Sequence, residues 1–288
     1  MNRTVRALVP SLATYEGDGF LVHRPFPTRS LAQVDPFLLL DEMGPLDVPP
    51  GAAKGASDHP HRGFEIVTYL LAGGLQHRDS HGHAGSIDPG DAQYMLAGDG
   101  VVHSEQPAAT IVRDGGTVHG VQLWINLPRD QKRLRPRYQD VRAKDVPVVE
   151  FGAGSRVRVV AGRGFGVASP LQTRHPVDYY HFTLAPGAVL DVPLVAATAA
   201  LAYVLAATVT IAGRAVERGT LAILSEAGEA VALENRTAEA VEMLLLASAP
   251  IGEPIVRYGP FVMNTRAEIE QAFADYQAGR FGEIARIN

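Results

Sequence analysis

The sequence reads Asp-His-Pro-His-Arg-Gly-Phe-Glu over residues 58–65 and Val-Val-His-Ser-Glu-Gln-Pro over residues 101–107. Each stretch holds two potential metal-binding side chains that are two residues apart. On a β-strand, side chains at i and i+2 point to the same face. Three imidazoles and one carboxylate that meet inside a β-barrel form a nitrogen–oxygen site suited to a divalent transition metal. The two stretches therefore predict a barrel with four metal ligands, His59, His61, His103 and Glu105.

Other polar residues nearby leave two interpretations open. Glu65 shares strand parity with His59 and His61, so it either completes the ligand set or orients a ligand from behind. Gln122 and Trp124 alternate toward one face of an expected strand, where they either line a pocket or pack in a core. Three further histidines, His77, His81 and His83, lie beside an expected turn. They are either solvated loop residues, or His77 or His81 lines the mouth of the cavity.

The pattern along the chain is that of a β-protein. Short apolar runs over 64–71, 92–96 and 118–127 are expected strands, and turns rich in glycine or proline separate them. Many short strands with regular turn signals favour an all-β sandwich or barrel. A second series of such runs covers roughly 157–247, and the charged stretch 129–133 indicates a crossing between the two series.

The two series resemble a weak internal repeat. Both place a glycine turn before an apolar strand, and aligning Gly90 with Gly219 sets His103 opposite Ala232. The second series keeps the β pattern but lacks the histidine cluster, because beyond His119 the chain has only His175 and His181. We therefore expect a duplicated barrel in which one lobe holds a metal and the other holds none.

The C-terminal segment predicts a helix. Thr265 and Glu268 form a capping-box pair, and an apolar stripe follows at helical spacing. Gly279 can end the helix. A single helix of this length is marginal in water, so it should pack on a barrel. The expected stripe consists of Ile269, Ala272, Phe273 and Tyr276.

Composition narrows the function classes. The 288 residues carry a formal net charge of −5, which disfavours direct nucleic-acid binding. The chain has no cysteine, so thiolate ligands and disulfides are excluded, which fits a reducing compartment. The N-terminus lacks the apolar core of a signal peptide, and no apolar run reaches the roughly 18 residues of a membrane span. With its many alanines and no basic localisation run, the chain is expected to be a bacterial cytoplasmic protein.

Five stretches together resemble the pirin family of the cupin superfamily. They are His-Pro-His-Arg-Gly-Phe-Glu at 59–65, Pro-Gly-Asp at 89–91, His-Ser-Glu at 103–105, Gln-Leu-Trp-Ile-Asn-Leu-Pro at 122–128 and Gly-Pro-Phe-Val-Met-Asn-Thr at 259–265. The resemblance implies an all-β bicupin, two stacked cupin barrels with a C-terminal helix. We expect a metal-binding cupin barrel over residues 1–130 and a metal-free one with the terminal helix over residues 131–288.

The resemblance also implies a cofactor and an activity. Pirins hold one divalent metal per chain on the motif positions that are His59, His61, His103 and Glu105 here. The usual metal is iron, and manganese, nickel, copper, zinc or cobalt also suit such a donor set. Some bacterial pirins open flavonols such as quercetin with dioxygen, as quercetin 2,3-dioxygenases. In such a reaction, Glu105 is the candidate base that accepts the proton of the flavonol hydroxyl.

Two other functions stay open at this stage. Other pirins act as metal-dependent regulators, either as transcription co-regulators or as modulators of metabolic enzymes, so a protein partner is an alternative to a small aromatic substrate. A sugar isomerase or a general small-molecule-binding cupin needs only the barrel, and the pirin motifs count against it. Fold alone does not decide among these roles. We expect a monomer without membrane attachment.

Overall fold

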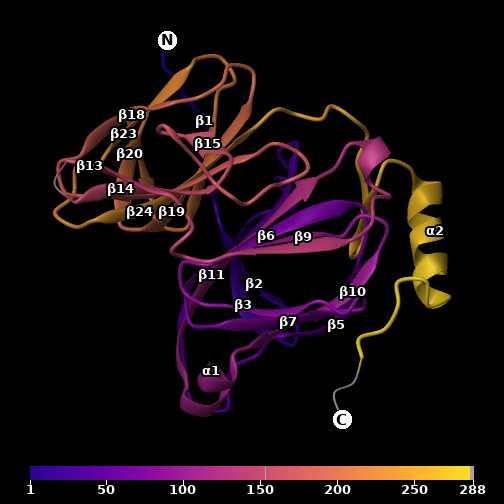
Figure 1. Ribbon diagram of the computed structural model, residues 1–288. Coiled ribbons are helices and arrows are strands. Elements are labelled where there is room, and N and C mark those ends of the chain that lie inside the picture. The colour runs from indigo at the N-terminus through magenta and orange to yellow at the C-terminus, as the bar shows by residue number, and fades with distance from the viewer. Residues whose placement is uncertain (153, 286–288) are drawn as a thin grey trace. The chain divides into compact units, whose positions relative to one another are not determined.

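The computed structural model describes residues 1–152 and 154–285, which fold into two compact units (Figure 1). The His-rich unit consists of Ala13–Arg24, Phe37–Lys144 and the chain from Ile251. The apolar unit consists of Met1–Leu12, Pro25–Pro36 and Asp145–Pro250. No helix among the described residues is long and apolar enough to cross a membrane.

Two antiparallel sheets form the barrel of the His-rich unit. The larger sheet has the strand order β12-β9-β6-β11-β4-β3-β2, and the smaller has the order β5-β10-β7-β8. The larger sheet comprises β2 (Leu12–Glu16), β3 (Phe20–Phe26), β4 (Phe37–Val48), β6 (Phe64–Ala72), β9 (Ala92–Leu96), β11 (Gly116–Asn126) and β12 (Arg137–Val141). The smaller sheet comprises β5 (Ala56–His61), β7 (Leu75–Asp79), β8 (Ala84–Ile87) and β10 (Val101–Pro107). The helix α1 (Ala109–Asp114) and the 3-10 helix η1 (Arg129–Gln131) lie between strands.

Three strands of this barrel were predicted from their apolar runs. The run 92–96 is β9 itself, and the runs 64–71 and 118–127 correspond to β6 and β11 with ends shifted by one or two residues. The strands β6 and β9 are buried on both faces for most of their length, so their sequences are nearly continuous apolar runs. The all-β class expected from the sequence is confirmed.

The apolar unit also contains two antiparallel sheets. One has the strand order β1-β22-β19-β24-β17-β14-β13, and the other has the order β18-β23-β20-β21. Their strands are β1 (Val5–Pro10), β13 (Val148–Phe151), β14 (Ser155–Ala161), β17 (Asp178–Leu184), β18 (Val189–Pro193), β19 (Ala199–Ala206), β20 (Thr208–Ile211), β21 (Arg214–Glu217), β22 (Thr220–Leu224), β23 (Ala230–Glu234) and β24 (Val241–Ser248). A short ribbon, β15 (Arg163–Gly164) and β16 (Val167–Ala168), joins β14 to β17.

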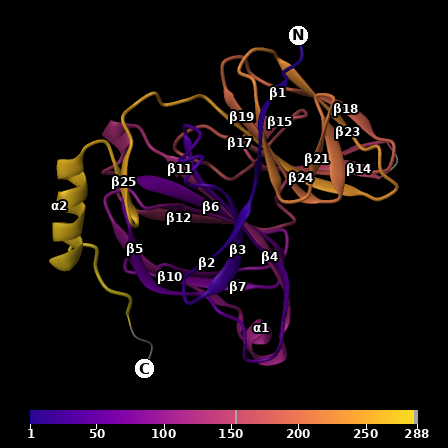
Figure 2. The same cartoon turned by 180° about the vertical axis from the view of Figure 1, so that it is seen from behind.

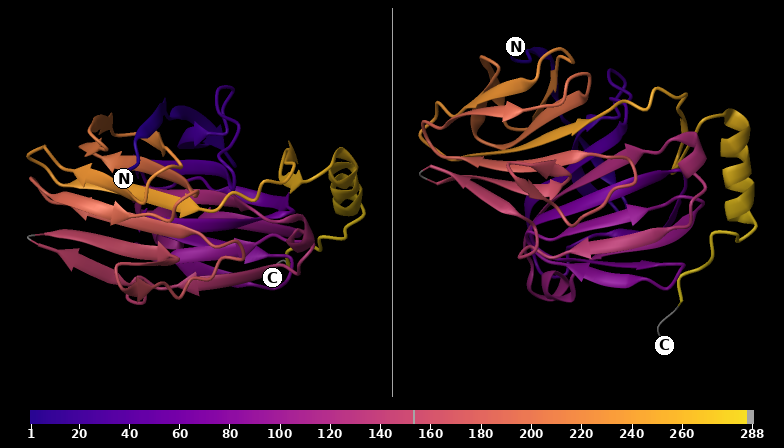
Figure 3. Two further views of the ribbon diagram at one scale, coloured as in Figure 1. Left: turned by 90° about the horizontal axis from the view of Figure 1, so that it is seen from above. Right: turned by 45° about the horizontal axis from the view of Figure 1, so that its top comes forward.

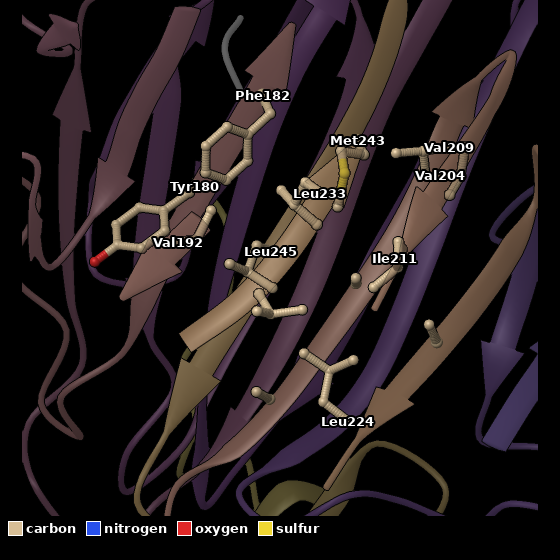
Figure 4. Close-up of a cluster of buried hydrophobic side chains, with 14 of the residues drawn as sticks. Tyr180, Phe182, Val192, Val204, Val209, Ile211, Leu224, Leu233, Met243 and Leu245 are labelled. Carbon is tan, nitrogen blue, oxygen red and sulfur yellow. The ribbon is translucent and has the colours of Figure 1, made fainter. Parts of the chain in front are cut away.

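Apolar side chains fill the interior of this second barrel (Figure 4). Tyr180 and Phe182 project from β17 toward aliphatic residues of the other strands, and their rings meet edge to face with 6.3 Å between centroids. The paired strands β18 and β23 contribute Val192 and Leu233, both fully buried. The space that a cupin would offer to a ligand is therefore occupied here by a hydrophobic core.

The C-terminal segment forms the predicted helix and belongs to the His-rich unit. A short ribbon, β25 (Val256–Tyr258) and β26 (Phe261–Met263), precedes the helix α2 (Arg266–Gln277), and both are yellow in Figures 2 and 3. Thr265 and Glu268 make both hydrogen bonds of the predicted capping box. The helix buries Ile269 and Ala272 in a cluster with Val102 of β10, Phe261 and Met263 of β26, and Phe281 beyond the helix.

The division into compact units does not follow the single boundary that we predicted near residue 130. The segment 131–144 belongs to the His-rich unit because β12 pairs with β9 along its whole length. The terminal helix belongs to that unit too, whereas the prediction assigned it to residues 131–288. Conversely, β1 lies in the apolar unit because it pairs with β22. The predicted crossing at 129–133 folds as η1 within the His-rich unit.

Candidate metal centre

Three of the four predicted ligands form one cluster. His59 and His61 lie on β5, His103 lies on the neighbouring β10, and the antiparallel register sets His103 directly opposite His59. The ring centroids of His59 and His103 are 4.3 Å apart, and those of His61 and His103 are 5.0 Å apart. One ligand nitrogen from each residue lies within 4.8 Å of the others. The i, i+2 spacing and the strand register together produce this arrangement.

Hydrogen bonds at the Nδ1 atoms orient all three imidazoles. His59 Nδ1 lies 2.7 Å from the carbonyl oxygen of Ser57, and His61 Nδ1 lies 3.3 Å from that of Pro260. A carbonyl only accepts, so both Nδ1 atoms carry the proton and both Nε2 atoms keep a lone pair. His103 Nδ1 lies 3.4 Å from the hydroxyl oxygen of Tyr138, whose own proton goes to the sulfur of Met95. Each ring therefore offers Nε2 as a ligand.

The environment of these rings fits a metal ion. Within the part of the chain that the structure describes, the buried Nε2 atom of His103 has no hydrogen-bond partner. A buried imidazole nitrogen normally has a partner, and a metal ion would supply one. Burial, and after it the neighbouring imidazole of His59, hold the pKa values of His61 and His103 well below the ordinary 6.5. His61 and His103 are therefore neutral at pH 7, which is the form that binds a metal.

Glu105 faces the same cavity but is not part of the three-nitrogen cluster. The pairing of β10 with β5 shifts register between His103 and Glu105, which is a β-bulge. Gln122 Nε2 donates to the Glu105 carboxylate at 3.1 and 3.3 Å, and Trp124 Nε1 donates to Gln122 Oε1 at 3.0 Å. Burial raises the pKa of Glu105 above its ordinary value. Glu105 is thus a more basic carboxylate than usual, and Gln122 fixes its position. That Glu105 is the fourth metal ligand stays a prediction.

The cluster opens into a cavity of about 530 Å³. Cavities of this size accept small organic ligands. Trp124, the single tryptophan of the chain, forms part of its wall and stacks on Phe64 with 4.3 Å between ring centroids. The remaining wall is both apolar and charged, with Phe20, Val22, Leu39, Met43, Glu16, Asp18, Arg24, Asp41, Asp58 and Arg257. Gln122 and Trp124 therefore both line the cavity, and Trp124 also packs in a core cluster, so for Trp124 both alternatives left open by the sequence hold.

Glu65 does not lie in this cavity. Its fully buried side chain accepts a hydrogen bond from the hydroxyl of Tyr94 at 2.7 Å. Its neighbours on β6, Phe64 and Ile66, belong to the core cluster that contains Trp124. Alternation along a strand places Glu65 on the opposite face. On one continuous strand, as expected from the sequence, Glu65 would share a face with His59 and His61. Arg62 and Gly63 separate β5 from β6, so the alternation of faces does not continue from one strand to the other.

The other histidines divide between buried and exposed positions. His77 lies on β7 rather than in a loop and is buried, with its ring stacked on Tyr138 at 4.8 Å. Gln93 donates to His77 Nδ1 at 2.5 Å. His81 and His83 lie beyond the end of β7, and both backbone amides bond to the carboxylate of Asp79. The solvated-loop interpretation is therefore wrong for His77.

Three residues that hold the site could not be assigned from sequence. Pro260 lies in the C-terminal segment and reaches His61 through a backbone carbonyl, which any residue type provides. Tyr138 reaches His103 from β12, which pairs with β9 and so lies at the end of the larger sheet. Arg257 precedes the quoted motif at 259–265 by two residues, and its role depends on how β25 folds back over the cavity. Only the motif that contains Pro260 gave any signal.

Comparison with known proteins agrees with this architecture. Residues 19–125 match the Pirin family and residues 179–282 match the Pirin C-terminal cupin domain. A pirin-like protein of Solanum lycopersicum is 40% identical over 97% of this chain and 93% of its own length. A putative quercetin 2,3-dioxygenase of Pseudomonas aeruginosa is 39% identical over 92% of this chain and 93% of its own length.

A solved structure extends the agreement to the backbone. The crystal structure of quercetin 2,3-dioxygenase from Acinetobacter baumannii matches with a TM-score of 0.93 and 36% identity, covering 99% of this chain and 100% of that one. The fold is accordingly a bicupin, as the sequence motifs implied. Sequence identity along nearly the whole length, both cupin domains and the histidine cluster lead to one assignment: this chain belongs to the pirin family.

Proposed function

We propose that this protein is an iron-dependent quercetin 2,3-dioxygenase, which opens flavonols with dioxygen. The observation that carries the proposal is the cluster of three imidazoles whose Nδ1 atoms are used in hydrogen bonds, next to a cavity large enough for a flat aromatic molecule. The names of the Pseudomonas aeruginosa and Acinetobacter baumannii relatives support the same reaction.

We propose that His59, His61, His103 and Glu105 hold one divalent metal per chain, and that this metal is iron. The donor set has nitrogen and oxygen atoms and no sulfur, which suits iron and also several other divalent ions. When bound, such an ion polarises the oxygens of the flavonol and exchanges electrons with dioxygen. The Nδ1 hydrogen bonds to Ser57, Pro260 and Tyr138 fix the rings so that the site is formed in advance.

The chain's own residues handle the proton. Glu105 accepts the proton of the flavonol 3-hydroxyl, and its raised pKa suits a base that works near neutral pH. Gln122 holds the Glu105 carboxylate, while Trp124 fixes the amide of Gln122 so that its NH₂ group faces that carboxylate. In the overall reaction the central ring loses one carbon as carbon monoxide, both atoms of dioxygen enter the depside product, and Glu105 returns the proton to its new carboxylate.

The test is a turnover assay with the iron-loaded protein. Aerobic incubation with quercetin should remove the flavonol absorbance and release carbon monoxide in equal amount. His103→Ala should abolish both signals with the loss of metal, whereas His175→Ala should not, because His175 bonds to the Ala249 carbonyl in the apolar unit. If protein loaded with iron, manganese, nickel, copper, zinc or cobalt in turn leaves quercetin unchanged, the dioxygenase proposal is wrong and a regulatory role becomes the better hypothesis.

A further inference from the structure

Arg257 extends from β25 into the wall of the metal cavity. Its guanidinium lies over the indole ring of Trp124, 4.8 Å from the ring centroid, and Nη1 donates to the carbonyl oxygen of Leu38 at 3.2 Å. The cavity wall that contains Arg257 also contains His59, His61 and Glu105. A planar cation is thereby held beside the histidine cluster by stacking and one hydrogen bond.

The charge of Arg257 is poorly compensated by the protein. The other cation of the wall, Arg24, is fully paired: it makes two hydrogen bonds to Asp41 at 2.7 and 2.5 Å and an ion pair with Glu16 at 2.6 Å. Arg257 has no carboxylate at ion-pair distance among the residues that the structure describes. Burial and then the positive charge of Arg24 lower the pKa of Arg257, the direction expected for an unpaired cation.

Most of the hydrogen-bonding capacity of Arg257 is free. A guanidinium carries five N–H donors in a rigid plane, and the Leu38 carbonyl uses one of them. Such a fork binds two oxygens of an anion in its own plane, and these charge-assisted bonds are stronger than neutral ones. A ligand with an anionic oxygen and a flat ring could bind the free donors of Arg257 through the oxygen and contact Trp124 through the ring.

We propose that Arg257 is the specificity-determining residue of this cavity and that it selects planar aromatic ligands carrying an anionic oxygen. That oxygen is either the ionised hydroxyl of a flavonol or an aromatic carboxylate. The flavonol case rests on the proposed dioxygenase function, whereas anion recognition itself requires no turnover. Arg257 is thus a positioning residue that orients the ligand relative to the histidine cluster.

The experiment measures binding without dioxygen, so that no reaction occurs. Metal-loaded protein is titrated by calorimetry with 2-naphthoate and with 2-naphthamide, its neutral isostere, while Trp124 fluorescence gives a second signal from inside the cavity. Because the metal itself attracts anions, variants are compared at equal metal content. Arg257→Gln removes the charge, Arg257→Lys keeps it without the planar fork, and Arg266→Gln is a charge-matched control at an exposed position of α2.

Arg257→Gln should weaken 2-naphthoate binding by about tenfold or more, the effect of losing a hydrogen bond to a charged group. It should change 2-naphthamide binding by less than about twofold. Arg257→Lys should restore part of the loss, and Arg266→Gln should bind both ligands as the wild type does. An equal loss for both ligands, or no loss for 2-naphthoate, would overturn the proposal, because Arg257 would then only support the cavity wall.

A titration with quercetin separates the two sources of the anion. Dependence of quercetin binding on Arg257 assigns the residue to the flavonol, and dependence of 2-naphthoate alone assigns it to aromatic carboxylates. Discrimination by charge without quercetin turnover would refute the dioxygenase function and leave Arg257 as the recognition residue. Turnover of quercetin without discrimination by charge would support the dioxygenase function and refute the role of Arg257 in recognising an anion.

Discussion

Asp275→Asn tests how the C-terminal helix supports the strand β5, which carries His59 and His61. Arg62 follows the candidate ligand His61 in the chain and is almost completely buried. Its Nη1 donates to Asp275 Oδ2 on α2 at 2.6 Å, its Nε donates to the carbonyl of Asp99 at 2.7 Å, and its guanidinium lies 4.5 Å from the ring centroid of Phe281. The Arg62–Asp275 pair therefore connects the helix to the end of β5, the strand that carries His61.

The cost of the substitution follows from two estimates. Burial alone would raise the pKa of Asp275, but the hydrogen bonds and charges of Arg62, Gln271 and Arg280 lower it from 3.8 to about 2. That decrease corresponds to about 2 kcal/mol of stability at pH 7. Removal of one partner from a buried ion pair costs roughly 3–5 kcal/mol. We expect Asp275→Asn to lower the unfolding free energy of the His-rich unit by about 3 kcal/mol at pH 7.

The same pair predicts the sign of a pH effect. A carboxylate whose pKa is depressed in the folded state stabilises the protein fully above its unfolded pKa, and this contribution disappears as pH falls through the folded pKa. The relevant window for Asp275 lies between its ordinary 3.8 and about 2. The stability difference between wild type and Asp275→Asn should therefore be constant from pH 5 to 8. At pH 3, about half of the stability that comes from the lowered pKa of Asp275 should be lost.

Urea denaturation of the metal-free protein, followed by fluorescence, measures this difference. Trp124 is the only tryptophan and lies in the His-rich unit, so its emission reports that unit. Glu270→Gln is the matched control, because Glu270 lies on the same helix and its ion pair with Arg266 is exposed. The control should change stability by less than about 0.5 kcal/mol. A variant as stable as the wild type at pH 7, or a difference that does not shrink at pH 3, would refute the reasoning.

Three further predictions concern the metal centre and its support. Tyr138→Phe should weaken metal affinity by about tenfold, because the acceptor of His103 Nδ1 is lost; competition with a chelator measures this, and unchanged affinity would show that the hydroxyl does not orient the ring. Glu105→Gln should retain some metal yet reduce quercetin turnover by at least about 100-fold, and near-normal turnover of the loaded variant would remove Glu105 from the chemistry. Lys132→Met should destabilise the His-rich unit by about 3 kcal/mol in urea, because the Gly63 and Val262 carbonyls and the Asn126 side chain lose a shared donor; a stable variant would mean that desolvation of the ammonium cancels these bonds.

The sequence predicted the cluster of three histidines because part of its cause is local. The spacing of His59 and His61 and the strand period place them on one face, and the antiparallel register sets His103 opposite His59. The capping box of α2 was predictable for the same reason, since Thr265 and Glu268 contact each other within one turn. The strand period and the first turn of the helix are fixed by secondary structure alone, whereas the pairing of β5 with β10 depends on the fold.

Contacts that depend on tertiary folding could not be predicted. Lys132 lies in the charged stretch that suggested a crossing between the two series, yet its ammonium is buried against three oxygen atoms contributed by separate segments. The helix stripe was also only partly right. Ile269 and Ala272 are buried, but Phe273 is half-buried and Tyr276 is 38% exposed, because α2 contacts the barrel through a narrower surface than the pattern indicated.

The apolar unit shows why a repeat in sequence need not repeat a site. The alignment of the glycine turns sets Ala232 opposite His103, and the structure pairs Ala232 with Asp191 as it pairs His103 with His59. Yet Asp191 is exposed, and the neighbouring residues Val192 and Leu233 face the core instead. A shift of one residue in a strand exchanges the two faces of the sheet.

This difference leads to a final prediction about metal stoichiometry. Asp191→His with Ala232→His restores the two aligned histidines, but it places them on the outer face of β18 and β23, away from the filled core. We expect elemental analysis to find the same single metal per chain in this double variant as in the wild type. A second tightly bound ion would mean that the strand faces can exchange, which the fully buried Val192 and Leu233 should prevent, because exposing each of them would cost about 1.5–3 kcal/mol.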